Sequence, residues 1–192
     1  MRLLVAVFTL TMLTAITGCG EQPAPETEAP DDSVTQQEET PRTGNSIVLA
    51  DGWAMTDAVS AVEVEAVMGT PGFSVFPEAA SSASSGRPIG SYNVSSVPYS
   101  KVRFEANVTG GQEAYDSAAG FLSNPTETAG SMWDSAVIGE VAAGDRTQVR
   151  IIVLKGDLYF SVSWEPEVFP ALDRTETCVK LAELLVTNLY GL

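Results

Sequence analysis

A clean two-residue alternation in residues 99–108 constrains the fold of this chain more than any other feature. Its apolar side chains are Val102, Phe104, Ala106 and Val108, and its polar side chains are Lys101, Arg103, Glu105 and Asn107. Successive side chains of a strand point to opposite faces of a sheet, so the pattern predicts one buried and one solvent-facing side. Such strands are typical of antiparallel sheets with one face packed on the core.

Four further segments have the β-branched and aromatic content of strands. They are residues 89–97, 136–141, 149–154 and 158–164, and residues 73–76 are a short candidate left out of the expected order. Residues 89–97 are the expected hairpin partner of 99–108, and the last three segments predict a meander. In residues 158–164, Leu158, Phe160, Val162 and Trp164 share one face, while Tyr159, Ser161 and Ser163 share the other.

The strongest local helix signal is a capping box at Ser60 and Glu63. The Ser60 hydroxyl can accept from the Glu63 amide while the Glu63 carboxylate reaches back to the Ser60 amide. Gly69 then closes the helix. The helical spacing places Val62, Ala66 and Val67 on its apolar face.

Two more helices are expected further along the chain. Residues 112–122 have an apolar side, and the dipeptide at 124–125 (NP) should stop that helix. Residues 171–189 form the longest expected helix, in which Glu176 and Lys180 are a supportive pair one turn apart.

The expected order is therefore helix-strand-strand-helix-strand-strand-strand-helix. This order predicts an α+β fold with a single antiparallel sheet and helices packed on it. We assign this globular domain to residues 46–192.

The N-terminal residues predict export and lipid anchoring. Residues 1–18 have a basic start and a short apolar run, as a secretory signal has, and the run is too short for an ordinary membrane span. Residues 16–19 (ITGC) resemble a bacterial lipobox, in which Cys19 would be the acylated residue, carrying a diacylglycerol and palmitate-type chains. Residues 19–45 are rich in acids and proline, which predicts a disordered, solvated linker.

Composition excludes several functions. The chain has 25 acidic and 10 basic residues and no histidine. The acidic excess argues against nucleic-acid binding, and the missing histidine removes every Ser-His or Cys-His arrangement. Besides Cys19 the only cysteine is Cys178, which is expected to be a buried structural thiol.

Residues 59–69 (VSAVEVEAVMG) resemble the opening helix of a family of actinobacterial secreted lipoproteins of unknown function. The layout is similar from residue 49 to 192, including a glycine-aromatic strand at 90–92, and it is also similar to the Mog1/PsbP-like sandwich. The resemblance implies a one-membrane host and supplies no catalytic site. Members of the family often carry two cysteines that form a disulfide. The matching positions in this chain are Thr56 and Ser91, so the resemblance implies that this disulfide is absent here.

No catalytic, cofactor or metal-binding motif stands out. Asp145, Asp157 and the pair Asp51 and Asp57 lie in expected turns, but no loop has EF-hand spacing. Trp164 is expected in the core, while Trp53 and Trp133 are undecided between core and ligand pocket. The ligand-binding residues are left open.

Three functions are compatible with these features. The first is a membrane-anchored extracytoplasmic lipoprotein that acts as a binding or accessory module for a small ligand, an envelope component or an exported protein. The alternative is a structural or envelope-assembly lipoprotein within a complex. A carboxylate-only hydrolase is the third, because two carboxylates about 5–9 Å apart in a cleft could act as acid and base.

Overall fold

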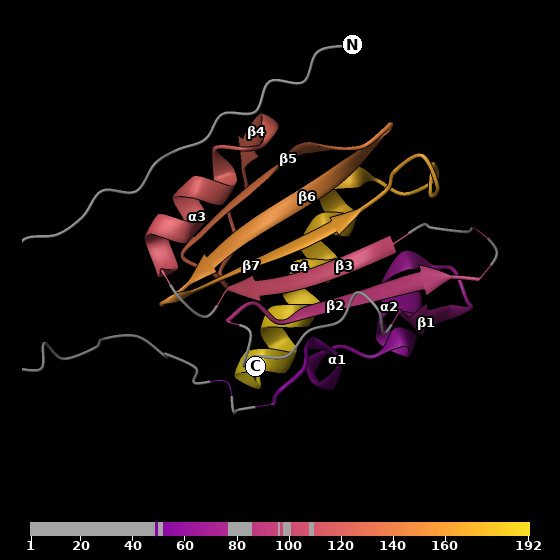
Figure 1. The fold of residues 1–192 in the computed structure, drawn as a ribbon, viewed down its shortest axis with the longest axis horizontal. Helices are drawn as coiled ribbons and strands as arrows, with labels where there is room; N and C mark the ends of the chain where they lie inside the picture. Colours follow the sequence, from indigo (N-terminus) through magenta and orange to yellow (C-terminus); the bar gives the residue numbers. More distant parts are fainter. Residues whose placement is uncertain (1–48, 50–51, 77–85, 96, 98–100, 108–109) are drawn as a thin grey trace, which may run out of the picture. The chain divides into compact units, whose positions relative to one another are not determined.

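Seven antiparallel strands form one open sheet in the order β1-β2-β3-β7-β6-β5-β4 (Figure 1). The structure is a computed structural model and describes residues 49, 52–76, 86–95, 97, 101–107 and 110–192. The strands are β1 (Phe73–Val75), β2 (Ile89–Val94), β3 (Lys101–Asn107), β4 (Ser123–Glu127), β5 (Ser135–Ala143), β6 (Arg146–Lys155) and β7 (Leu158–Trp164). The predicted α+β class with a single antiparallel sheet is confirmed.

Four helices cover the two faces of this sheet. They are α1 (Met55–Ala58), α2 (Ala61–Met68), α3 (Gly111–Ala119) and α4 (Arg174–Tyr190). Helices α1, α2 and α4 lie together on one side of the sheet, which we call the α4 face. Both α1 and α2 contact α4, and each of the three helices also contacts strands. Helix α3 packs on β6 and β7 from the opposite side, which we call the α3 face.

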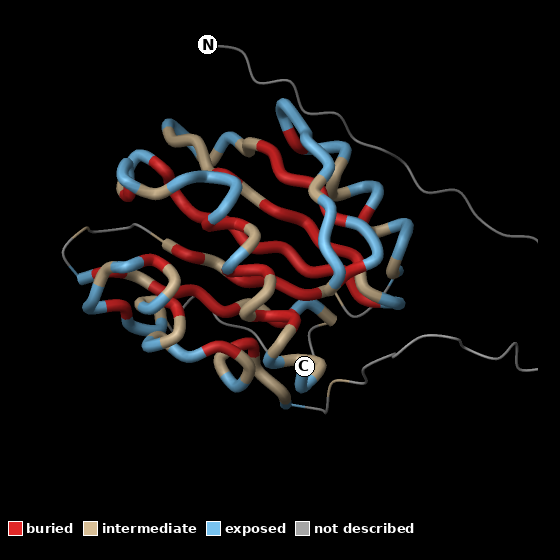
Figure 2. Tube along the Cα trace, turned by 180° about the vertical axis from the view of Figure 1, so that it is seen from behind, coloured by how far each residue is buried: buried red, intermediate tan, exposed pale blue. Residues whose placement is uncertain are grey.

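The main core lies between the sheet and α4. The predicted apolar side of β3 supplies Val102, Phe104 and Ala106, and each of these is completely buried. Phe104 lies opposite Val162 of β7 in the strand register, and Leu181 of α4 belongs to the same cluster. Seen from behind, the central strands are buried along most of their length (Figure 2).

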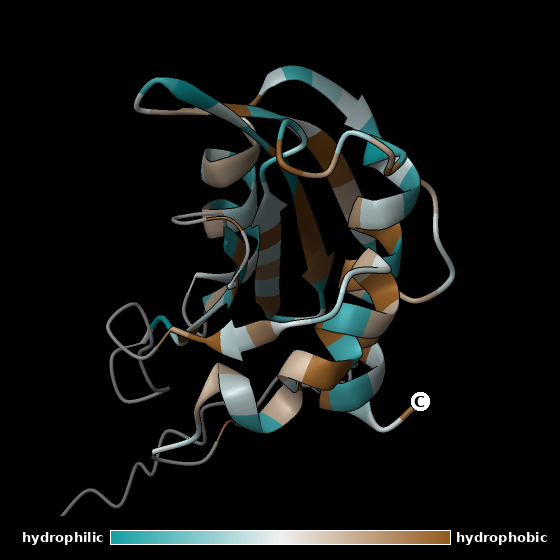
Figure 3. Ribbon diagram, turned by 90° about the vertical axis from the view of Figure 1, so that its right-hand side faces the viewer, coloured by the Kyte–Doolittle hydropathy of each residue, from teal (hydrophilic) through white to brown (hydrophobic). Residues whose placement is uncertain are grey.

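Helix α4 shows how the sequence pattern becomes packing. Its N-cap is Asp173, whose carboxylate accepts from the Glu176 amide, so the helix begins three residues later than predicted. Glu176 and Lys180 form the expected ion pair at 2.6 Å. In Figure 3 the helix carries both hydrophilic and hydrophobic bands, as an amphipathic helix packed on a sheet does.

The capping box of α2 is confirmed, but the predicted buried face of this helix is wrong at Val62 and Ala66, which are exposed, while Val67 is partly buried against the core. Ser60 accepts from the Glu63 amide, and Gly69 has a left-handed φ of 60°. The buried side chains are Val64 and Met68, whereas Val62 is 72% exposed. The helix has apolar residues on several sides, and its contacts with α4 and β1 decide which side is covered.

Two elements were missed by the sequence patterns. The four-residue helix α1 has no apolar repeat long enough to detect. Strand β4 spans the NP dipeptide that was expected only to stop a helix. Proline is tolerated there because β4 is an edge strand, and the register shifts between Ser123 and Thr126.

The polar side of β3 is also less exposed than predicted. Glu105 is only 5% exposed, because α3 and the segment that holds Arg87 lie over the same face. The prediction of a fully solvent-facing side is therefore wrong.

Several expectations fall outside the described residues. These are the signal at 1–18, Cys19, the linker at 19–45, Asp51 and Val108. Among the helices that the structure describes, none has the length and apolar character needed to cross a membrane.

Candidate functional site

Helix α3 covers only part of its face of the sheet. A small apolar cluster lies beneath it, made of Tyr115, Leu122, Val137, Ile152, Leu154 and Tyr159. The chain after the helix approaches β5 closely at Gly139, where a Cβ atom would lie 2.7 Å from the Leu122 Cβ. This contact places the helix over β5, β6 and β7 and leaves the neighbouring part of the face to polar side chains.

Those polar side chains form rows across the strands. One row crosses β2, β3, β7 and β6 in that order. The register places in it, one from each strand, Ser91, Arg103, Ser163 and Arg150. In the next row Glu105 lies opposite Ser161. We call these six residues the polar strip. The strip crosses the boundary between β3 and β7, so its side chains come from segments far apart in the sequence.

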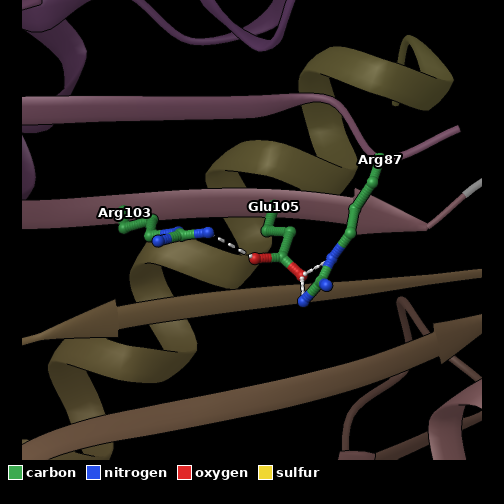
Figure 4. A network of polar contacts seen from close by, with 3 residues as sticks. All are labelled: Arg87, Arg103 and Glu105. Atoms are coloured by element: carbon green, nitrogen blue, oxygen red, sulfur yellow. Dashed lines mark hydrogen bonds and ion pairs between the residues drawn. The ribbon is translucent and has the colours of Figure 1, made fainter. Parts of the chain in front are cut away.

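Glu105 is the negative centre of the strip. Its carboxylate accepts from Arg87 Nε at 2.6 Å and from Arg103 Nη2 at 3.0 Å (Figure 4). The hydrogen bond and charge of Glu105 raise the pKa of Arg87. Both carboxylate oxygens are therefore used, and the buried anion is held between two guanidinium groups.

Arg150 is a cation without such a partner. Among the described residues no hydrogen bond or ion pair of its guanidinium is found, and its buried Nε has no acceptor. Burial lowers the pKa of Arg150, and the nearby charges of Arg103 and Arg87 lower it further, while that of Glu105 raises it. Three arginines and one glutamate leave a local net charge of +2 in a chain whose net charge is −15.

Unsatisfied polar atoms gather on this same face. Within the described ranges, four buried side-chain atoms have no hydrogen-bond partner: Ser91 Oγ, Asn93 Oδ1, Arg103 Nε and Arg150 Nε. The strand alternation places all four on the α3 face. Buried polar atoms are nearly always paired in native proteins, so these four atoms make the α3 face a candidate binding surface.

A cavity of about 670 Å³ lies between α3 and the polar strip. Its polar wall includes Arg87, Glu105, Asn107, Arg150, Tyr159 and Ser161. Its apolar wall includes Ala114, Ala118, Phe121, Val141 and Ile152. Phe121 is 77% exposed and so lies at the rim. The volume is within the range of small-molecule sites, about 300–1,000 Å³.

A second cavity of about 190 Å³ lies near β4 and the start of α4. The cation among its described lining residues, Arg174, is already paired with Glu140 at 2.7 Å. It is smaller, and its charge is compensated, so it is the less suitable binding site.

The residues singled out by sequence are not brought together here. Cys19 lies outside the described residues. Cys178 is a buried free thiol, as predicted; it accepts from Trp164 Nε1 at 3.3 Å, and burial raises its pKa to about 12. Trp164 is completely buried in the core, and Trp133 also belongs to the core cluster. Trp53 is partly buried and packs against this cluster.

The acidic residues do not form a metal site within the described part of the chain. No group of three or more Asp, Glu, His or Cys side chains there could hold a metal ion. Glu105 is the one carboxylate among the described side chains that line the larger cavity. The paired carboxylates that a hydrolase would need are therefore not gathered at this cavity.

Sequence reasoning missed the residues that make the cavity. One available signal was Arg150, a charged residue inside the otherwise apolar stretch 149–154. A second was the run of small polar residues, Ser161 and Ser163, on one side of a central strand. Together these features indicate that the second face of these two strands is covered by something other than an apolar core.

Comparisons with protein-family models, with curated proteins and with solved structures give no match to this chain. The resemblance to actinobacterial lipoproteins stays a prediction from sequence.

Proposed function

We propose that the globular domain is a small-molecule binding module and that the cavity between α3 and the polar strip is its binding site. The observation that carries this proposal is Arg150, which lines a cavity of suitable volume and whose buried Nε has no acceptor among the described residues. We further propose that the protein is lipid-anchored at Cys19 on the extracytoplasmic face of the cell membrane, where the module would meet its ligand.

A binding role fits the side chains at the cavity better than a catalytic one. Both carboxylate oxygens of Glu105 already accept from arginines, so neither is left to act on a substrate. The chain has no histidine to serve as a base. The alternative of a structural lipoprotein within a complex has one supporting feature, the exposed Phe121 at the rim.

The test is to fill the cavity and measure ligand capture. Ala118 of α3 lines the cavity and is partly buried, so Ala118→Trp should occupy the space without removing a charge. The matched control is Ala66→Trp, on the exposed side of α2. Native mass spectrometry of protein isolated from host membranes, and thermal shifts with a panel of small molecules, should detect ligands for the parent chain and for Ala66→Trp.

We expect Ala118→Trp to lose those ligands while it stays folded. If the filled variant captures the same molecules as the parent chain, the cavity is not the binding site. If no small molecule is captured and the protein co-purifies with a fixed protein partner instead, the structural alternative is favoured.

A further inference from the structure

We infer that the ligand of this cavity is an amphipathic organic anion, with an oxyanion head group bound at Arg150 and an apolar body against α3. The inference rests on the proposed function, because it assigns a ligand class to the same cavity. It follows from three features: a half-buried arginine without an anion of its own, two buried guanidinium Nε donors without acceptors, and an opposite wall that includes the methyl groups of Ala114 and Ala118.

The first feature is the charge of Arg150. The other arginine that lines the cavity, Arg87, is held by Glu105, and so is Arg103 beside it. Arg150 has no anion of its own among the described residues, and burial lowers its pKa. Arg150 is half-buried and its Nε is fully buried, and partial loss of water makes an unpaired charge costly, so a bound anion would reduce a cost that the free protein carries.

The second feature is the arrangement of the donors. Arg103 and Arg150 both lie opposite Ser163, one on each side of β7. Their Cα atoms are therefore two strand spacings apart, about 10 Å. The Nε atoms of both residues are buried and lack acceptors. A guanidinium presents parallel N–H groups that match the two oxygens of a carboxylate, phosphate or sulfonate.

Glu105 gives this arrangement its selectivity. It fixes Arg87 and Arg103 by ion pairs and leaves Arg150 as the guanidinium open to a ligand. The remaining local charge of +2 repels cations and attracts anions, in contrast to the acidic chain as a whole. A neutral or cationic ligand would leave the half-buried Arg150 guanidinium without an anion.

The third feature is the apolar wall. Ala114 and Ala118 present only methyl groups from α3, and Ile152 forms part of the floor. Phe121 at the rim exposes 77% of its surface, and a bound apolar group could cover it. A small inorganic anion would leave these apolar side chains in contact with water, so an anion with an apolar body fits the cavity better.

The experiment uses two dyes of similar shape. Anilinonaphthalene sulfonate carries an anionic head on an aromatic body, and N-phenylnaphthylamine is a neutral counterpart. The full chain and the variants Arg150→Gln, Ala118→Trp and Arg174→Gln are titrated with each dye, and fluorescence gives the dissociation constants. A thermal melt of each variant checks that it is folded.

Arg150→Gln should weaken binding of the sulfonate dye about tenfold or more, since a hydrogen bond to a charged group is typically worth one to two factors of ten. The neutral dye should change less than about twofold. Arg174→Gln removes an arginine at the smaller cavity on another part of the molecule, and it should leave both dyes unaffected.

The outcomes separate the ligand class from the site. If Ala118→Trp abolishes binding of both dyes but Arg150→Gln changes neither, the cavity stands and the anionic class is wrong. If Ala118→Trp has no effect on either dye, or if neither dye binds the parent chain, both the site and the ligand class are overturned. Weakening by Arg174→Gln equal to that by Arg150→Gln would overturn the assignment to Arg150.

Discussion

Arg150 shows how one residue can lower stability while it serves binding. Its guanidinium lies on the inner side of a central strand, and burial lowers its pKa. Replacing a buried, poorly paired charge by an apolar group of similar volume is often neutral or stabilising by about 1–4 kcal/mol. Residues kept for binding are the ones at which such a cost persists.

We therefore expect Arg150→Met to raise the free energy of unfolding by about 1 kcal/mol while it lowers affinity for the sulfonate dye. Urea denaturation of the ligand-free protein measures the first effect. The exposed Arg174→Met is the control, and it should change stability by less than about 0.5 kcal/mol. A clear loss of stability in Arg150→Met would mean that the guanidinium has a structural partner.

At the scale of elements, the position of α3 decides whether a cavity exists. The segment after the helix sits on β5 because Gly139 has no side chain: a Cβ there would lie 2.7 Å from the Leu122 Cβ and 2.9 Å from the Ser123 carbonyl oxygen. The helix is thus held against the sheet at its C-terminal end, and the space toward β3 stays open.

Gly139→Ala should lower the free energy of unfolding by about 1–3 kcal/mol, the usual cost of overpacking. Because the clash is with the segment that follows α3 and holds it on the sheet, it should also weaken binding of the neutral dye. Denaturant unfolding and dye titration check the two effects. Gly144→Ala, in the β5–β6 turn with open space around it, tests backbone strain without a clash and should leave dye binding intact.

The sequence predicts elements whose signal is local. The cap of α2 depends on Ser60 and Glu63 alone, and the apolar side of β3 depends on simple alternation, so both are confirmed. The buried face of α2 was mispredicted because its cover comes from α4, more than a hundred residues away. Glu105 was misplaced for the same reason, since Arg87 and α3 cover it from other parts of the chain.

The candidate site was beyond sequence reasoning because its members are matched only by strand register. Arg103 and Arg150 become neighbours through β7, which pairs with both β3 and β6. Nothing in the local sequence of either arginine indicates that pairing. Strand β4 was missed for a related reason, since it forms only as an added edge on β5.

At the scale of the whole molecule, the missing histidine shapes how stability depends on pH. The buried thiol of Cys178 has a pKa raised to about 12, and burial also raises the pKa of Tyr190 to about 12 and that of Tyr92 still higher. Raised values mean that the folded protein keeps these protons after the unfolded chain has lost them. Their stabilising effect is present at neutral pH and is lost as the pH rises.

Stability should therefore change little between about pH 6 and pH 8, where no histidine titrates, and fall above about pH 9. Urea midpoints measured across this range test the expectation. Cys178→Ala should delay the onset of the fall, because it removes the group whose ordinary pKa of 9.0 is lowest among the three. A maximum or minimum near pH 6.5 would contradict it.

The anchor proposed for the molecule has its own test. Cys19→Ala removes the thiol that acylation needs, so the variant should leave the membrane fraction or stay unprocessed. Cell fractionation with detection of the protein measures this. Cys178→Ala is the matched control and should fractionate as the parent chain does, since Cys178 is buried in the core. Unchanged membrane binding and processing of Cys19→Ala would exclude the lipobox.

The sheet order has a consequence for how the protein folds. Strands β1 to β3 come early in the chain and β4 to β7 late, and the two groups meet only where β3 pairs with β7. Pairing of such distant strands is a slow, non-local event, whereas the β4–β7 meander can form from neighbouring segments. Arg87 and Glu105 belong to the first group and Arg150 to the second. The cavity is thus complete only once β3 has paired with β7. A ligand that contacts both groups of strands would slow the separation of this strand pair.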